Sequence, residues 1–386
     1  VVKGNNGFIV LENQGIVENC INNGNLIVGD ITGTSNLGML VSKQTADGSV
    51  IRGCVNNGNT ICPDAGMNLA GQTLAGGIVG RLDKGTVENC TNNGSFGFKV
   101  NNVGANQYVG GIVGFFDNGT EEQVIKNCYN KGTVFVEGEG TVKPVSVGGI
   151  LGASKTNALT GTGTAGAVHY GTIANCGNEG SVYMSSTCAG GGYSNVGGIA
   201  GYLEGSVFDC YSTETASVRN INTGTDPDAN NKTGAAVGGI AGRIVFNAIR
   251  CQNYGEVLMS GSFAAGTAKK AFIGGSEAPC VGGCFGAIGG ITLSEGVMSM
   301  CENYSSNISV AGMKMKSSNA TATYIGGVAG FNSNEAKMCS NEGNILVEKN
   351  QHKSARVGGI VGTNVGTLGN CWNAGDITVT SPLSTE

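Results

Sequence analysis

Residues 85–96 read GTVENCTNNGSF: a cysteine stands between two asparagines, Asn-Gly follows, and apolar residues then return. Variants of this stretch recur about every forty residues, as in GIVENCINNGNL from Gly15 and TIANCGNEGSVY from Thr172. Ten copies occur along the 386 residues. A period of this length from end to end indicates one repeat array, where the chain length alone would allow two or three domains.

Aligned on the cysteine, the copies share further columns. Asparagine stands two residues after the cysteine in every copy except the sixth, which has Ser212, and glycine usually follows two residues later. The cysteine column is Cys20, Cys54, Cys90, Cys128, Cys176, Cys210, Cys251, Cys301, Cys339 and Cys371. The asparagine column is Asn22, Asn56, Asn92, Asn130, Asn178, Asn253, Asn303, Asn341 and Asn373.

The spacing of these columns indicates a strand with one buried face. Cys90, Asn92 and the apolar Phe96 are separated by even numbers of residues, which is the period of a strand and does not fit a helix. In a parallel stack, equivalent residues of neighbouring coils lie about 4.8 Å apart. The asparagines are therefore predicted to form a ladder of side-chain hydrogen bonds, and the cysteines a buried column of small fillers.

A second signature, GGIVG or GGIAG, precedes most of the cysteines, as in VGGIVG from Val109. Each unit is thus predicted to hold three short strands, separated by corners where glycine supplies backbone angles that other residues resist. Such short strands are stable only when each coil stacks on the next. The sequence predicts an all-β parallel β-solenoid of about ten coils over residues 1–380, right-handed by the crossover rule. Residues 381–386 are interpreted as the start of a Ser/Thr/Pro linker or tail.

Within VGGIVG, Val109 and Val113 share one strand parity, and Ile112 has the other. On a regular strand, one apolar residue of each coil would face outward. These residues would form an apolar stripe along the rod, and such a stripe would favour association between copies of the chain. The alternative is a bend that brings both Ile112 and Val113 into the core.

The column cysteines are predicted to be reduced thiols. In-register side chains run parallel, which leaves their Cβ atoms farther apart than the ~3.8 Å that a disulfide prefers. Four further cysteines lie off the column: Cys62, Cys188, Cys280 and Cys284. The last two, in CVGGC, either form a local bridge or simply pack.

Composition excludes some classes of partner. Charged residues make up 13% of the chain, the formal net charge is -5, and no basic run is present to hold a phosphate backbone. Nucleic acid is therefore not an expected partner. Apolar segments such as VGGIVGFF from Val109 are far shorter than the ~20 residues of a membrane helix, so no transmembrane segment is expected in this chain.

The two signatures together resemble the GLUG repeat family, whose units carry a Gly-Leu-any-Gly core and often a following NC-x-N-x-G segment. Here the core reads GGIVG or GGIAG, and the resemblance extends over nearly the whole chain. It implies an extracellular or cell-surface location, because such repeats occur in secreted and surface proteins of bacteria. The family implies location better than activity.

Few residues suggest chemistry of their own. Asp226, Asp228 and Asn230 place side-chain oxygens at alternating positions, an arrangement that would suit a surface calcium ion; an ordinary Asx-rich turn is the alternative. No other cofactor is expected. Glycoside hydrolysis needs paired carboxylates, and no carboxylate pair is expected at a shared column of adjacent coils.

Length variation indicates where binding would occur. The cysteine spacing is 34 residues from Cys20 to Cys54 but 48 from Cys128 to Cys176, and solenoid insertions extend from corners, where loops bind partners. We expect a non-catalytic extracellular structural and adhesive module. Its corner loops would bind a host or cell-surface protein or glycan, or copies of the chain itself. The alternative is a carbohydrate-active right-handed β-helix, of the polysaccharide lyase or hydrolase kind, with its site among those loops.

Overall fold

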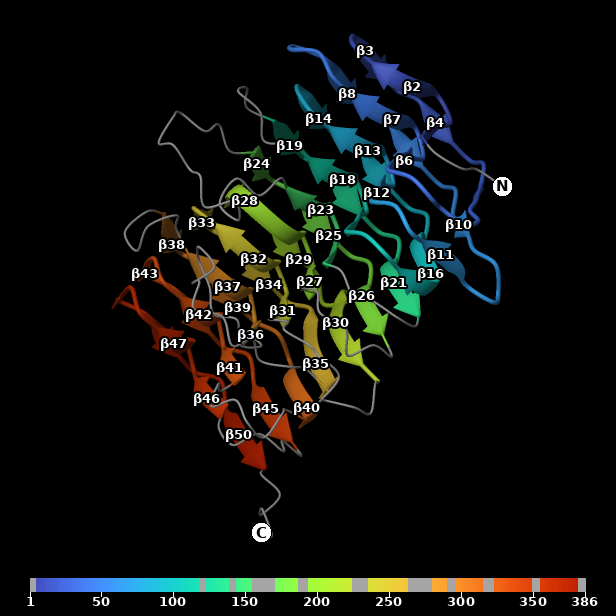
Figure 1. Cartoon of the computed structure of the whole chain (residues 1–386). Coiled ribbons are helices and arrows are strands. Elements are labelled where there is room, and N and C mark those ends of the chain that lie inside the picture. The colour runs from blue at the N-terminus through green and yellow to red at the C-terminus, as the bar shows by residue number, and fades with distance from the viewer. Residues whose placement is uncertain are drawn as a thin grey trace, which may run out of the picture.

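The described strands wind into coils that stack along one axis, with the two chain ends at opposite ends of the stack (Figure 1). None of the described residues is helical, and so none forms a helix long and apolar enough to cross a membrane. The predicted all-β parallel solenoid is confirmed. The computed structural model describes residues 5–117, 123–138, 144–154, 171–186, 194–223, 235–262, 280–289, 296–314, 323–348 and 355–380.

The third coil illustrates the repeating unit. Its strands are β12 (Thr73–Gly76), β13 (Val79–Leu82), β14 (Thr86–Glu88), β15 (Thr91–Asn92) and β16 (Phe96–Val103). Each pairs in parallel with its equivalents in neighbouring coils, and we call the five resulting sheets 1 to 5 in this order. Sheets 1 and 4 each contain ten strands, one per coil, so the predicted number of coils is confirmed. We number the coils 1 to 10 from Cys20 to Cys371. The expectation of three strands per coil was wrong, because the chain turns more often than the glycine pattern suggests.

One of these turns lies directly before the column cysteine and separates sheet 3 from sheet 4. The residue at this position has φ between 52° and 63° in all ten coils. Asparagine tolerates this left-handed conformation better than most residues, which accounts for Asn89, the first asparagine of residues 85–96. Coils 7, 8 and 9 place Arg250, Met300 and Met338 there instead.

Glycine in the repeat is required mainly by close backbone contact. The GGIVG glycines, all of them described, do not have positive φ, whereas corner glycines such as Gly53 and Gly85 do, at 63° and 83°, so the expectation for corner glycines holds at some corners only. A Cβ atom at Gly58 would lie 2.0 Å from the carbonyl oxygen of Gly24 in the coil before it, and one at Gly111 would lie 2.1 Å from the oxygen of Gly149. A larger residue would therefore push neighbouring coils apart.

The GGIVG segment bends, and its apolar residues all enter the core. β17 (Gln107–Gly110) ends before the turn and β18 (Val113–Phe116) begins after it. Ile112 and Val113 are both fully buried. The predicted apolar stripe on the outside of this strand was therefore wrong, and it offers no basis for lateral association.

The longest sequence insertions leave the stack at two corners, as expected. One corner joins sheet 2 to sheet 3, as between β23 (Leu151–Ser154) and β24 (Gly171–Ala174). The other joins sheet 5 to sheet 1 of the next coil, as between β35 (Glu256–Ser262) and β36 (Cys280–Gly282). From coil 4 to coil 9, six successive connections of this second kind lie largely outside the described residues. The proposed linker at 381–386 also lies outside them.

We expect Met338→Asn to stabilise the protein by about 1 kcal/mol, because asparagine reduces the cost of the left-handed conformation. Met338 is exposed, so the substitution removes little packing. The shift of the urea unfolding midpoint measures the effect. Met338→Ala is the matched control, since alanine shortens the side chain without favouring positive φ. Equal midpoints for the two variants would show that the backbone conformation is not the cause.

Candidate functional site

The asparagine column forms the predicted ladder through the core. In the second coil, the Asn56 amide nitrogen donates to Gly58 O at 2.9 Å and to Asn92 Oδ1 at 2.7 Å. Its Oδ1 accepts from the Asn22 amide at 2.8 Å and from Gly58 N at 3.1 Å. Both amide hydrogens and the carbonyl oxygen of a fully buried side chain are thus satisfied.

The ladder runs in two segments with one direction. Each amide donates to the asparagine of the following coil, from Asn22 to Asn178 and again from Asn253 to Asn373. Ser212 interrupts it between these segments. Its hydroxyl donates to Gly239 O at 2.6 Å instead, so the break in the sequence column is also a break in the hydrogen-bond chain.

The cysteine column lies beside the ladder. The eight cysteines from Cys54 to Cys339 are buried, and Cys20 and Cys371 in the two end coils are half-buried. All ten are free thiols that contact the carbonyl oxygen two residues earlier, at 3.2–3.6 Å. Burial raises the pKa of thiols such as Cys176 and Cys301 well above the ordinary value, which keeps them protonated and unreactive.

The remaining predicted residues divide into two groups. Cys280 and Cys284 are both buried and are not bonded to each other, so CVGGC packs without a local bridge, and Cys62 is half-buried. Cys188 and the calcium candidates Asp226, Asp228 and Asn230 lie outside the described residues. Within the part of the chain that the structure describes, no group of three or more His, Cys, Asp or Glu side chains is placed to hold a metal ion.

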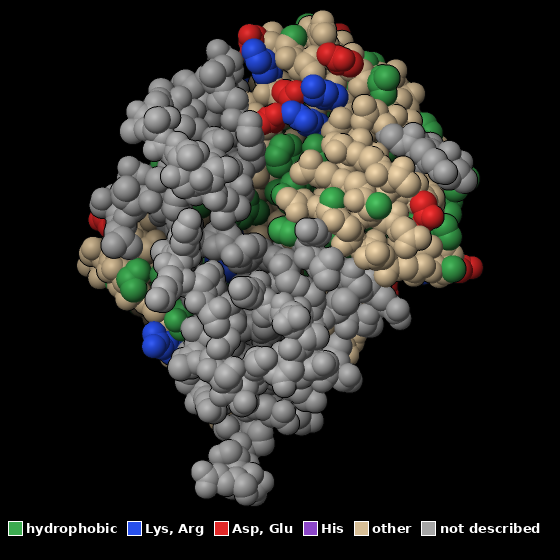
Figure 2. Space-filling view, in the orientation of Figure 1, with side chains coloured by type: hydrophobic (Ala, Val, Ile, Leu, Met, Phe, Trp, Pro, Cys, Tyr) green, Lys and Arg blue, Asp and Glu red, His purple; other side chains and the backbone are tan. Residues whose placement is uncertain are grey.

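A cluster of charged side chains on the outer face of sheet 2 was not predicted. Figure 2 shows positive and negative side chains gathered near the N-terminal end of one face, next to hydrophobic ones. The register of β2 (Val10–Asn13), β7 (Val41–Gln44) and β13 aligns Glu12, Lys43 and Arg81 in one outward column. Asp83 and Asp117 follow at the ends of β13 and β18 in neighbouring coils.

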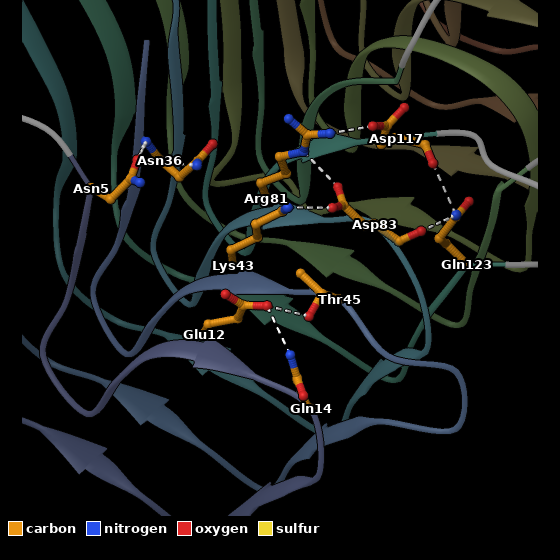
Figure 3. A network of polar contacts seen from close by, with 10 residues as sticks. All are labelled: Asn5, Glu12, Gln14, Asn36, Lys43, Thr45, Arg81, Asp83, Asp117 and Gln123. Carbon is orange, nitrogen blue, oxygen red and sulfur yellow. Dashed lines mark hydrogen bonds and ion pairs between the residues drawn. The ribbon is translucent and has the colours of Figure 1, made fainter. Parts of the chain in front are cut away.

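Arg81 bridges the two aspartates (Figure 3). Its Nε lies 2.5 Å from Asp83 Oδ1 and its Nη2 contacts Asp117 Oδ2, and Lys43 Nζ lies 2.9 Å from Asp83 Oδ2. Burial alone would lower the pKa of Arg81, but the hydrogen bonds and charges of the two aspartates outweigh it and raise the pKa. The guanidinium is therefore a fixed positive charge between two coils.

Asp83 and Asp117 correct the expectation about carboxylates. The pairing of Leu82 with Phe116 places the two aspartates at one position of adjacent coils. A shared carboxylate column therefore exists. Both carboxylates are paired with Arg81, whereas glycoside hydrolysis needs a carboxyl group placed to give its proton to the leaving group. The geometry suits a bridge between coils or a binding surface better than proton transfer.

An apolar group continues the same column toward the C-terminal end. Phe115 pairs in register with Arg81 and packs with Leu74, Ala153 and Tyr202. The ring of Tyr108 stacks on Phe115 with centroids 5.2 Å apart. These side chains come from the outer faces of sheets 1 and 2, so the two sheets meet there at an inward angle. The outer surface thus changes from charged to aromatic within two coils.

We expect Asn56→Leu to destabilise the protein by about 2–4 kcal/mol, because the substitution leaves buried partners in three coils without hydrogen bonds. Asn57→Leu is a matched control on the next residue. Asn57 is exposed and bonds only to Asn23 and Asn93 at the surface, so its loss should change stability by about 0.5 kcal/mol or less. Urea unfolding midpoints compare the two. Similar losses for both would contradict a buried, stability-determining ladder.

We expect iodoacetamide to label the native protein at Cys20, Cys62 and Cys371 before any of the eight buried column cysteines, which should react only in denaturant. Burial limits access to those thiols. Mass spectrometry of the digested protein assigns the labelled positions. Rapid native labelling at Cys90 or Cys176 would show that the column is open to solvent.

Comparison with known proteins supports the repeat assignment. Neither a curated protein nor a solved structure matches the chain. The family model described as the GLUG motif matches residues 71–97, which span the third coil from its GGIVG segment through its cysteine and ladder asparagine. The resemblance predicted from the sequence is confirmed over these residues, which match the GLUG motif.

Proposed function

We propose that this chain is a non-catalytic extracellular module, displayed on or released from a cell, that holds a row of binding loops on a stiff rod. The GLUG motif and the repeat architecture support this proposal. The target is a cell-surface glycoprotein or glycan, and the segments that join sheet 5 to sheet 1 make the contact.

The observation that carries the proposal is the position of the inserted segments. In the register of the stack, six residues lie between Val100 and Gln107 in the third coil, and six lie between the equivalent Gly138 and Val145 in the fourth. The equivalent spans of coils 6 and 7, which hold residues 224–234 and 263–279, are two to three times longer, so two successive coils carry an enlargement at the same corner. In other solenoids, insertions at one corner of neighbouring coils form the face that binds partners.

One observation favours a second candidate, a polysaccharide-active β-helix. Asp83 and Asp117 are a carboxylate pair in adjacent coils with a cation between them. Because Arg81 pairs with both, we rank this reading below the binding module. A single experiment separates the two functions.

Immobilised mucin, a heavily glycosylated surface, serves as the probe. One variant replaces residues 224–234 with Asn-Val-Gly-Ala-Asn and residues 263–279 with Asn-Val-Gly-Ala-Asn-Gln, which are residues 102–106 and 102–107 of the short third-coil connection. The control variant replaces residues 155–170, at the other corner, with Asp-Lys-Gly from residues 83–85. We expect mucin binding to fall at least tenfold in the first variant only, with unfolding midpoints showing that both are folded.

Three results would contradict the proposal. Wild-type protein could fail to bind mucin, or the first variant could bind as well as the wild type. Release of reducing or unsaturated sugars from mucin or polysaccharide by the wild type, lost in Asp83→Asn, would support the enzymatic alternative instead.

A further inference from the structure

Coil 6 departs from the repeat just after the break in the ladder. Strand register aligns Asn178 with Ser212 and Val182 with Val218. Three residues, 179–181, join these positions in coil 5, whereas coil 6 uses five, 213–217. The two extra residues form a turn closed by Ala216 N, which donates to Thr213 O at 3.0 Å.

The turn is fixed to its neighbours. The hydroxyls of Thr213 and Thr215 lie 2.9 Å apart, and Thr215 Oγ1 donates to Glu179 O in coil 5 at 2.9 Å. Glu214, at the tip, is exposed. The insertion is thus a defined wall on the outer surface.

Two tyrosine rings face the space beside this wall. A Cβ atom built on Gly177 would lie 2.6 Å from Tyr211 Cζ, so the Tyr211 ring lies over the bare backbone of coil 5. Tyr254, in coil 7, stacks on Tyr304 of coil 8 with centroids 5.0 Å apart and planes 11° from parallel. One ring is therefore held toward coil 5 and the other toward coil 8.

A shallow pocket of about 450 Å³ lies between them, lined by Tyr211, Thr213, Glu214, Thr215 and Tyr254. This size falls in the range of small-molecule sites. The lining combines aromatic rings with hydroxyl groups and one carboxylate. Such a surface can cover the apolar face of a ligand and hydrogen-bond to polar groups at its edge.

Acidic groups dominate the surroundings. Burial and the charges of Glu302 and Glu214 raise the pKa of Tyr254. Burial, a hydrogen bond to Glu302 and the charges of Glu302 and Glu342 raise the pKa of Tyr304. Burial, Tyr129 and Glu179 raise the pKa of Tyr211. Of the residues that line the pocket, Glu214 is the charged one; Lys131 is paired with Glu179 at 3.4 Å, and Arg219 donates to Ser217 Oγ at the far end of the insertion. An anionic ligand would be repelled at this surface.

We propose that the pocket at coil 6 binds a neutral saccharide of one or two pyranose rings. The apolar face of a sugar ring stacks on Tyr254, Tyr211 covers the opposite side, and Thr213, Thr215 and Glu214 bond its hydroxyl groups. The site is separate from the corner loops of the proposed function, and it arises from the only coil in which the ladder residue is not asparagine.

Saturation-transfer NMR and calorimetry with cellobiose, maltose and lactose test this on the whole chain. We expect at least one of them to bind, with signal transfer to the C–H protons of a ring face. Tyr211→Ala and Tyr254→Ala should each weaken binding at least tenfold. Gly177→Val introduces the residue that stands at the equivalent position of coil 2, Val55. It should weaken binding, because the new side chain displaces the Tyr211 ring without removing it.

Tyr183→Ala is the matched control, because Tyr183 also stacks on an aromatic ring, Phe135, on a different sheet. It should leave saccharide binding unchanged. The variant without residues 224–234 and 263–279 should still bind the disaccharide, so the two proposals fail independently.

Four outcomes would overturn the inference. The first is that no neutral disaccharide binds, and the second is that the folded Tyr211 and Tyr254 variants bind as well as the wild type. The third is that Tyr183→Ala loses binding to the same extent as they do. The fourth is that the protein binds galacturonate or choline more tightly than the neutral sugars. Unfolding midpoints establish that each variant is folded.

Discussion

Hydrogen bonding between successive coils, in one fixed register, is the constraint on which the rest of the structure depends. A one-residue slip in any coil would turn its inward side chains outward and separate each ladder amide from its partners. The asparagine ladder makes such a slip costly, because a buried amide needs an equivalent amide both before and after it. Glycine follows from the same constraint, since coils in register bring their backbones into contact at Gly58 and Gly111.

The parts of the fold that could be predicted are those that every coil repeats. Nine asparagines in one column indicated the ladder, and even spacing placed Cys90 and Asn92 inside. Features that belong to the backbone path were missed. The left-handed turn at Asn89 was missed because the residue before the cysteine varies between coils, as with Arg250 and Met338, so this column does not indicate a backbone requirement. The GGIVG bend was offered only as an alternative, since parity assumes a regular strand and cannot show where the strand ends.

The pairing of Asp83 with Asp117 on the surface was not predicted, for a different reason. Asp83 lies seven residues before its cysteine and Asp117 eleven, because the connection between sheets 2 and 3 is longer in coil 4. Alignment on the cysteine separates the two aspartates, whereas alignment on GGIVG, as in GGIVGRLD and GGIVGFFD, brings them together.

The buried polar pairs of sheet 2 were also missed. Asn13 pairs with Gln44 and Asn332 with Asn364 near the two ends of the stack, with apolar residues such as Phe116 between them.

The interruption at Ser212 has a consequence for how the rod comes apart. Stability in a repeat protein is approximately a sum over neighbouring units, and each unit opens with its own free energy. A rod with one weaker junction behaves as two cooperative blocks: the five coils before Ser212, and the four after it. Amide hydrogens in the two blocks would then exchange with different protection, with the boundary at coil 6. Under tension along the axis, this coil would part before the others.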